Sequence, residues 1–223
     1  MRVKLPPARY TETMADAPDP GEHPPSLRDE QVRQTRAALV AAGRRLFGRD
    51  GFAATSVEDL ARAARVTTGA LYHHFPTKAA LFETVFEEIH LELLAASGAA
   101  LGESLGTIEV LARGGEAFLD AVLAPDLQRI VIIDAPAVLG LARFTELDER
   151  YAVVAIVAAL QGAVAAGEIA VDDPETLARL FLGILTRGAM LIANSAEPSA
   201  TRHAVARALR VLLAGLAAGS NPR

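Results

Sequence analysis

The sequence predicts an all-α fold on three observations. Apolar residues recur at three- and four-residue spacings through most of the chain, as the inner face of a helix requires. Expected helix starts carry capping residues or proline, for example Asp173 followed by Pro174. No alternating polar and apolar run is long enough to predict a β-strand. We therefore expect a small N-terminal helical head and a larger helical body.

The N-terminal region divides into a tail and a first helix. Residues 1–25 contain six prolines and no apolar periodicity, which predicts a disordered tail. The first helix is expected from Ser26 to Gly48, and Gly51 ends it. Its apolar stripe consists of Leu39, Ala42, Leu46 and Phe47.

Residues 55–75 predict two short helices with almost no loop between them. Thr55 is expected to cap the first, with Glu58 completing a capping box, and Thr67 to cap the second. These two short helices are too small to bury a core of their own. They must therefore pack on a flanking helix and leave the second helix exposed. This arrangement is typical of a helix-turn-helix unit that reads duplex DNA.

A long helix is expected from Pro76-Thr77-Lys78 to about Ser97-Gly98, and everything after it is helical in pattern. The capping pattern predicts starts after Asp134, at the Thr145 to Asp148 box, and after Asp173. The expected body helices span about 107–123, 126–133, 136–142, 146–167, 174–194 and 200–217.

The chain resembles the TetR-like family of bacterial transcriptional regulators. The segments that carry the resemblance are Thr35-Arg36, Ala41 to Phe47, Asp50 to Phe52, Thr55 to Val57, Leu60-Ala61, Leu71 to Phe75 and Lys78 to Phe82. The segment from Ile132 to Gly140 also looks like the ligand domain of some members. The family usually has glycine in the turn where this chain has Arg65. The backbone of this turn can therefore differ from the one usual in the family.

The resemblance implies a helix-turn-helix DNA-binding head at 26–82, with a helical ligand-binding and dimerisation body at 83–217. Residues 1–25 and 218–223 would be tails. Charge is consistent with this division. The segment from Arg28 to Lys78 has nine basic and five acidic residues, whereas Leu91 to the end has ten basic and fifteen acidic residues. A solvated helix face explains the basic excess nearly as well.

Composition narrows the class of protein further. The chain has no cysteine, which excludes disulfides, thiolate catalysis and Cys-based zinc sites. The first fifteen residues lack the apolar core of a secretory signal. The longest uncharged run, Tyr151 to Gly167, is shorter than the roughly 20 residues of a membrane span. We therefore expect a soluble cytoplasmic protein with no membrane partner.

The DNA contacts are expected around the second short helix. Its first turn faces the major groove in helix-turn-helix proteins, and Tyr72 and His73 can donate from its far end. Lys78 is expected to share a phosphate with a helix N-terminus. The resemblance adds a phosphate role for Thr55, and Thr35 and Arg36 are weaker candidates. The expected DNA-binding residues are Thr35, Arg36, Thr55, Thr67, Thr68, Gly69, Ala70, Tyr72, His73 and Lys78.

Two features raise the alternative of an enzyme. Glu83, Glu87 and His90 share one helix face and could hold a metal, although a solvated face explains them as well. Asp134 in an apolar setting could be a perturbed carboxylate or a helix cap. No hydrolase elbow, P-loop or metalloprotease motif is present. We therefore expect no catalytic residues, no metal and no cofactor.

The body is expected to dimerise and to bind an effector. The small and apolar residues expected in the dimer interface are Leu177, Leu180, Phe181, Gly183, Ile184, Gly188, Val205, Leu209, Leu212, Leu213 and Leu216. The residues expected to line an apolar pocket are Phe118, Val122, Ile130, Ile133, Asp134, Val138, Phe144 and Tyr151.

The function expected from the sequence is that of a repressor which a small apolar or amphipathic ligand releases from a palindromic operator. The alternatives are a regulator without an effector, and a helical small-molecule binder or enzyme that does not act on DNA.

Overall fold

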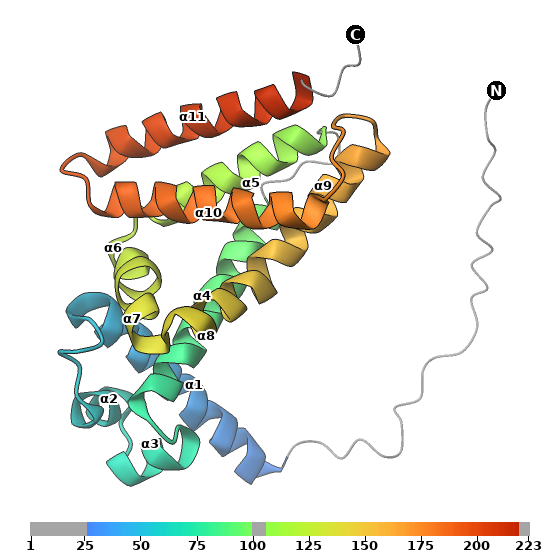
Figure 1. The fold of residues 1–223 in the computed structure, drawn as a ribbon. Helices are drawn as coiled ribbons and strands as arrows, with labels where there is room; N and C mark the ends of the chain where they lie inside the picture. The colour runs from blue at the N-terminus through green and yellow to red at the C-terminus, as the bar shows by residue number, and fades with distance from the viewer. Residues whose placement is uncertain (1–25, 100–105, 219–223) are drawn as a thin grey trace, which may run out of the picture.

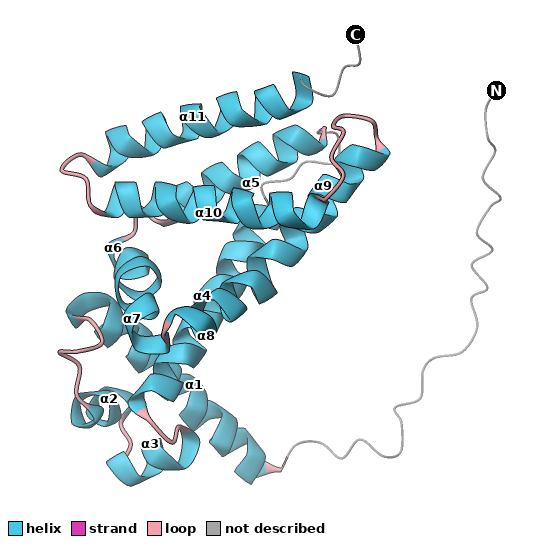
Figure 2. Ribbon diagram, viewed as in Figure 1, coloured by secondary structure: helices cyan, strands magenta, loops and turns pink. Residues whose placement is uncertain are grey.

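The computed structural model describes residues 26–99 and 106–218, and no strand occurs among these residues (Figures 1 and 2). The all-α prediction is confirmed. The expected N-terminal tail and all but residue 218 of the expected C-terminal tail lie outside the described residues.

Three helices form the head: α1 (Leu27–Asp50), α2 (Val57–Ala64) and α3 (Thr68–His74). α1 begins where the sequence predicted. The Ser26 side chain accepts a hydrogen bond from the Asp29 backbone N–H, and the Asp29 carboxylate accepts one from the Ser26 backbone N–H. It ends at Gly51, whose φ of 85° is a conformation that favours glycine. α2 packs on both α1 and α3.

The long helix α4 (Lys78–Ala99) runs from the head into the body (Figure 1). Its first half is buried on one side, where Phe82, Phe86 and Ile89 lie in a core that also contains Phe47 of α1 and Ile130 of the body. The Phe47 and Phe82 rings meet edge to face, 5.3 Å between centroids. One hydrophobic core therefore crosses the expected boundary between head and body.

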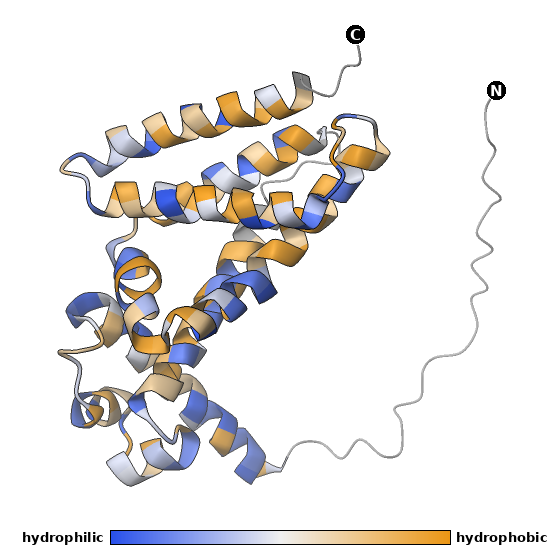
Figure 3. Ribbon diagram, viewed as in Figure 1, coloured by the Kyte–Doolittle hydropathy of each residue, from blue (hydrophilic) through white to orange (hydrophobic). Residues whose placement is uncertain are grey.

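The body contains a set of α-helices interrupted by two π-helical stretches, η1 (Gln128–Asp134) and η2 (Glu149–Val153). The α-helices are α5 (Thr107–Ala121), α6 (Pro125–Leu127), α7 (Ala135–Leu139), α8 (Leu141–Asp148), α9 (Val154–Ala165), α10 (Pro174–Ala193) and α11 (Pro198–Ala218). α5 packs against α4, α9, α10 and α11 around a second apolar core. Figure 3 shows hydrophobic residues spread along α9, α10 and α11.

Two expected helix boundaries are wrong. The sequence predicted a break after Asp134, but helical backbone continues from Pro125 to Leu139 and ends at Gly140, whose φ is 76°. Asp134 makes no cap hydrogen bond, because its carboxylate accepts from the Phe52 N–H of the head instead. The capping box at Thr145 is also wrong, since helical backbone already starts at Leu141. The cap at Asp173 before Pro174 is confirmed.

Candidate nucleic-acid interface and ligand cavity

The first helix of the helix-turn-helix pair is capped by a residue that differs from the expected one. Ser56 is the N-cap of α2, and its hydroxyl accepts from the Asp59 N–H at 3.0 Å. Thr55 is buried, and its hydroxyl donates to the Gly51 carbonyl at 2.8 Å. The expected box of Thr55 and Glu58 is therefore wrong. The Thr55 side chain is turned into the head and is not presented to solvent.

The turn between α2 and α3 depends on Arg65. This residue has φ 58° and ψ 39°, and it is the only non-glycine residue with positive φ in the described part of the chain. Its N–H donates to the Arg62 carbonyl at 3.1 Å, and the next N–H, of Val66, donates to Ala61. Arg65 thus adopts the left-handed conformation that glycine adopts at low cost, and it is exposed at the surface of the head.

α3 has the two-sided character required of a recognition helix. Leu71 and Phe75 are buried and fix the helix to the head. Thr67 caps it, accepting from the Ala70 N–H at 3.1 Å. The outer face carries the expected residues Thr67, Thr68, Gly69, Tyr72 and His73, all exposed, with Ala70 half-buried at its edge.

Gly69 lies on this outer face without a packing reason for being glycine. A Cβ atom there would have the Thr67 hydroxyl as its one neighbour, at 3.8 Å. The missing side chain is compatible with close approach of a nucleic acid backbone or base edge. At the end of α3, burial together with the charges of His73 and Arg36 lowers the pKa of His74, which favours its neutral form.

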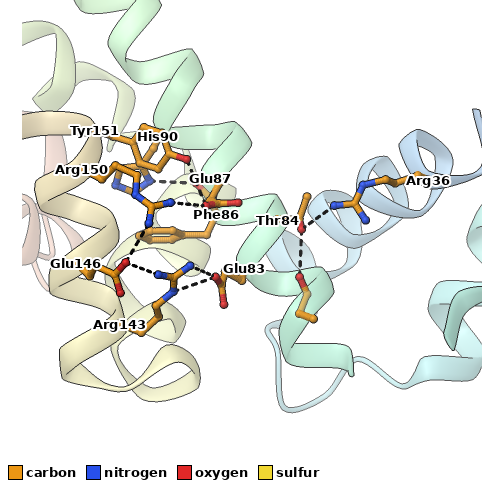
Figure 4. Close-up of polar contacts among 11 residues, drawn as sticks. Arg36, Glu83, Thr84, Phe86, Glu87, His90, Arg143, Glu146, Arg150 and Tyr151 are labelled. Atoms are coloured by element: carbon orange, nitrogen blue, oxygen red, sulfur yellow. Dashed lines mark hydrogen bonds and ion pairs between the residues drawn. The ribbon is translucent and has the colours of Figure 1, made fainter. Parts of the chain in front are cut away.

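Two expected phosphate contacts are engaged within the protein. Lys78 Nζ donates to the carbonyls of Phe52 and Thr55, each at 2.8 Å, and lies 4.1 Å from the Phe52 ring centroid. Arg36 lies 4.3 Å from the Phe75 ring centroid and donates to the His74 carbonyl at 3.4 Å. It also donates to the Thr84 hydroxyl at 3.4 Å (Figure 4). Both cations therefore stabilise the structure of the head. Thr35 is half-buried on α1.

The body contains an apolar cavity of about 200 Å³ between α4, α5, η2, α9 and α10. Phe118 and Tyr151 line it, as expected from the sequence. α10 also contributes, through Phe181, Leu182 and Leu185, and this contribution was missed. Six expected lining residues lie elsewhere: Val122, Ile130, Ile133, Asp134, Val138 and Phe144.

The six residues outside the cavity are used in packing or at the surface. Val122 and Ile130 are fully packed in the first core, and Val138 and Phe144 lie against it. Ile133 is 51% exposed. Asp134 binds the head. Because η1 is π-helical, residues three and four apart do not share a face as they would in a regular α-helix, and η1 as a whole packs against α1 and α10.

The polar end of the cavity is formed by His90 of α4 and Asp148 of α8. His90 is 6% exposed; its Nδ1 lies 3.0 Å from the Phe86 carbonyl and its Nε2 lies 3.4 Å from Asp148 Oδ1. The Tyr151 hydroxyl donates to Glu87 at 3.2 Å (Figure 4).

The contacts of His90 with Asp148 and of Glu87 with Tyr151 form a seam along α4, and a neighbouring ion cluster extends this seam between α4 and α8. Arg143 binds Glu83 and Glu146 (Figure 4). Hydrogen bonds to Glu146 and then Glu83 raise the pKa of Arg143 above its ordinary value. Glu83, Glu87 and His90, considered together for a metal, therefore each face a separate partner on α8 or η2. They form a packed seam and not a solvated face, and the described residues contain no cluster suited to a metal.

Comparison with known proteins gives the same assignment for both halves. The family described as "Bacterial regulatory proteins, tetR family" matches residues 39–85, and "Tetracyclin repressor-like, C-terminal domain" matches residues 108–216. A TetR-family transcriptional regulator of known structure from Pectobacterium atrosepticum is 35% identical, with a TM-score of 0.74 over 84% of this chain and 96% of that one.

Two curated relatives from Pseudomonas putida match over shorter lengths. The transcriptional regulator TtgR is 39% identical over 61 residues, which are 27% of this chain and 29% of TtgR. CymR is 31% identical over 123 residues, which are 52% of this chain and 61% of CymR. The match to TtgR thus spans less than a third of that relative. The agreement of both family matches with the nearly full-length structural match is decisive, and the chain belongs to the TetR family of bacterial transcriptional regulators.

Proposed function

We propose that this protein is a transcriptional repressor that binds a palindromic operator as a homodimer and is released by a small, mostly apolar molecule. The observation that carries the DNA-binding part is α3, whose inner side is anchored by Leu71 and Phe75 while its first turn stands exposed. A rigid helix with an exposed N-terminal turn is what major-groove recognition requires.

The DNA surface of this proposal consists of the outer face of α3. Thr68 and Ala70 can contact thymine methyl groups, and Tyr72 and His73 can donate to phosphates or bases. Thr55, Arg36 and Lys78 support this face indirectly, since their polar groups bind backbone carbonyls of the head. The head then comprises 26–82 and the body 83–217, with α4 continuous across the boundary.

The cavity supports an effector-controlled regulator over one without an effector. A core that served dimerisation alone would gain stability by filling this space, because a void forfeits contacts between its lining atoms. Its lining reaches α4, the helix that continues into the head. A ligand that binds one head spacing better than the other would shift the population away from the DNA-competent dimer.

The proposed homodimer uses exposed apolar residues of α10 and α11. Leu180 and Ile184 of α10 are 63% and 41% exposed, and Leu212 of α11 is 55% exposed. In the described residues, α10 is the one helix whose length and composition would suit a membrane span, and 39% of its most apolar window is buried. Pairing with a second copy accounts for its remaining apolar face. We therefore propose a cytoplasmic dimer.

A gel-shift assay with DNA from upstream of the protein's own gene tests the proposal. We expect wild type to bind a palindromic segment, with half-sites about 34–36 Å apart or more, and binding to weaken steeply with salt. Thr68→Ala should change which base is preferred at one position of each half-site. The matched control is Thr145→Ala on α8, also exposed, which should leave the preference unchanged. Equal binding of wild type to unrelated DNA would contradict the proposal.

A further inference from the structure

The cavity has an apolar wall and one polar end. Aromatic rings of Phe118 and Phe181 and aliphatic side chains line most of it. Among the residues that the structure describes, the only ionisable groups besides Tyr151 in its lining are His90 and Asp148. No lysine or arginine within 26–99 or 106–218 lines it. An anionic ligand would therefore meet a carboxylate with no fixed cation to offset the cost of burying its charge.

The hydrogen-bond geometry of His90 restricts the ligand further. The Phe86 carbonyl can only accept, so a hydrogen bond at 3.0 Å places a proton on Nδ1 of His90. The other ring nitrogen, Nε2, lies 3.4 Å from the Asp148 carboxylate. If His90 is neutral, two acceptors face each other there. If His90 is charged, Nε2 donates towards Asp148.

A hydroxyl group fits both protonation states. With neutral His90 it donates to Asp148 or to Nε2, and with charged His90 it accepts from Nε2 while it donates to Asp148. A carboxylate can only accept and is repelled by Asp148. An ammonium can only donate. It fits the two acceptors of the neutral state, but with charged His90 it adds a second positive charge and leaves the Nε2 proton without an acceptor.

The size of the cavity sets the size of the ligand. A buried apolar cavity of about 150 Å³ accommodates benzene. This cavity, of about 200 Å³, is partly open to solvent and accommodates a molecule, or the inner part of one, of roughly eight to ten non-hydrogen atoms. Gly114 of α5 lies in the lining, and a Cβ atom there would have no neighbour within 4 Å. A side chain at this position would therefore project into the empty space.

We propose, on the basis of the proposed effector-controlled function, that the effector is a small, uncharged, mostly apolar alcohol or phenol whose hydroxyl is bound between His90 and Asp148. Its apolar part lies against Phe118 and Phe181. Because His90 belongs to α4, the hydroxyl inserts into the seam between α4 and α8, which connects the cavity to the head.

Isothermal titration of the full-length protein with four probes of similar size tests this inference: phenethyl alcohol, propylbenzene, phenylacetate and phenethylamine. We expect the alcohol to bind about tenfold more tightly than propylbenzene, the gain of one well-made hydrogen bond. Phenylacetate should bind at least as weakly as propylbenzene. Failure of the alcohol to bind up to its solubility limit, or equal or tighter binding of phenylacetate or phenethylamine, would overturn the inference.

Two variants separate recognition of the ligand hydroxyl from a general loss of protein structure. Asp148→Asn keeps the size of the side chain and removes its charge, so the preference for the alcohol over phenylacetate should shrink about tenfold. Gly114→Leu should abolish binding of the alcohol. The thermal unfolding midpoint of this variant should stay at or above that of wild type. Alcohol binding that persists in Gly114→Leu would place the ligand elsewhere.

A parallel gel shift distinguishes the two proposals. DNA binding without alcohol binding would overturn the ligand class and leave the DNA-binding function intact. Alcohol binding without operator binding would support the ligand class and overturn the repressor.

Discussion

Asp134 and Phe52, 82 residues apart in the chain, are joined by a hydrogen bond of 2.7 Å from the Phe52 backbone N–H to the Asp134 carboxylate. The same carboxylate oxygen lies 3.4 Å from Arg129 Nε, whose guanidinium covers Gly51 so closely that a Cβ atom there would clash. The Phe52 carbonyl accepts from Lys78. The loop after α1 is thus held between η1 of the body and the start of α4.

We expect Asp134→Ala to reduce the free energy of unfolding by about 1–3 kcal/mol, because it leaves the half-buried Phe52 N–H without its partner. Urea denaturation measures this change. Asp134→Asn is the control, since its amide oxygen can still accept from Phe52, and it should cost less. If the two variants were equally destabilised, the hydrogen bond to Phe52 would not be the source of the loss.

Adjacent glycines of α5 should respond in opposite directions to alanine. A Cβ atom at Gly115 would lie 2.8 Å from a methyl carbon of Leu209 and 3.1 Å from one of Leu185, so Gly115→Ala should destabilise by about 1–2 kcal/mol. Gly114→Ala faces the cavity and should stabilise by up to about 1 kcal/mol through helix propensity. Thermal unfolding of the two variants under one buffer condition compares them. Equal effects would contradict the packing of α5 on α10 and α11.

Arg65→Gly should stabilise the head by about 1 kcal/mol, because glycine adopts the left-handed turn conformation without the steric cost that arginine bears. Arg65→Asn is the matched control: it also removes the charge and tolerates this conformation less well than glycine. The ranking of unfolding midpoints should be glycine, asparagine, arginine. A midpoint for Arg65→Gly below that of wild type would mean that contacts of the arginine outweigh the strain.

The features that local sequence could predict are those fixed within a few residues. The caps Thr67 and Asp173 were predicted because a hydroxyl or carboxylate and the N–H it binds are three residues apart. The cap of α2 was misplaced by one residue because Thr55 with Glu58 and Ser56 with Asp59 satisfy the same pattern. Burial of Thr55 in the head selects Ser56 as the cap, and this burial depends on tertiary packing and not on the local sequence.

The cavity could not be predicted in the same way. A π-helical stretch changes which side chains share a helix face. The sequence pattern of residues 126–167 does not predict either of the π-helical stretches η1 and η2. His90 shares its periodicity with Glu83 and Glu87 and so resembled a surface position. Its partner Asp148 is 58 residues away. Only the packing of α4 on η2 and α8 shows that this face is interior.

Lys78→Met should weaken DNA binding to all sequences alike. Methionine keeps the apolar stem over the Phe52 ring but cannot donate to the two loop carbonyls, so the loop that positions α2 should loosen. Because Nζ is bound within the protein, the slope of log affinity against log salt should stay nearly constant in titrations of operator DNA. A slope smaller by about one unit would instead show that Lys78 contacts a phosphate.

The exposed apolar residues of α10 should pair across a two-fold axis. Of the residues expected in the interface, Phe181, Gly188, Leu209 and Leu213 are buried within the protomer, whereas Leu180, Ile184 and Leu212 are exposed. Leu191 and Val211, which the sequence did not single out, are exposed as well.

Ile184→Asp places a charge on this surface, and burying it at an interface without a partner costs more than a dimer contact can offset. We expect light scattering at micromolar concentration to give a dimer for wild type and a mass near 23.5 kDa for Ile184→Asp. Leu141→Asp, at a 76% exposed position on α8, should remain dimeric. The monomer should also lose operator affinity with an unaltered head, because each half-site then binds alone. A wild-type monomer, or a dimeric Ile184→Asp, would contradict this interface.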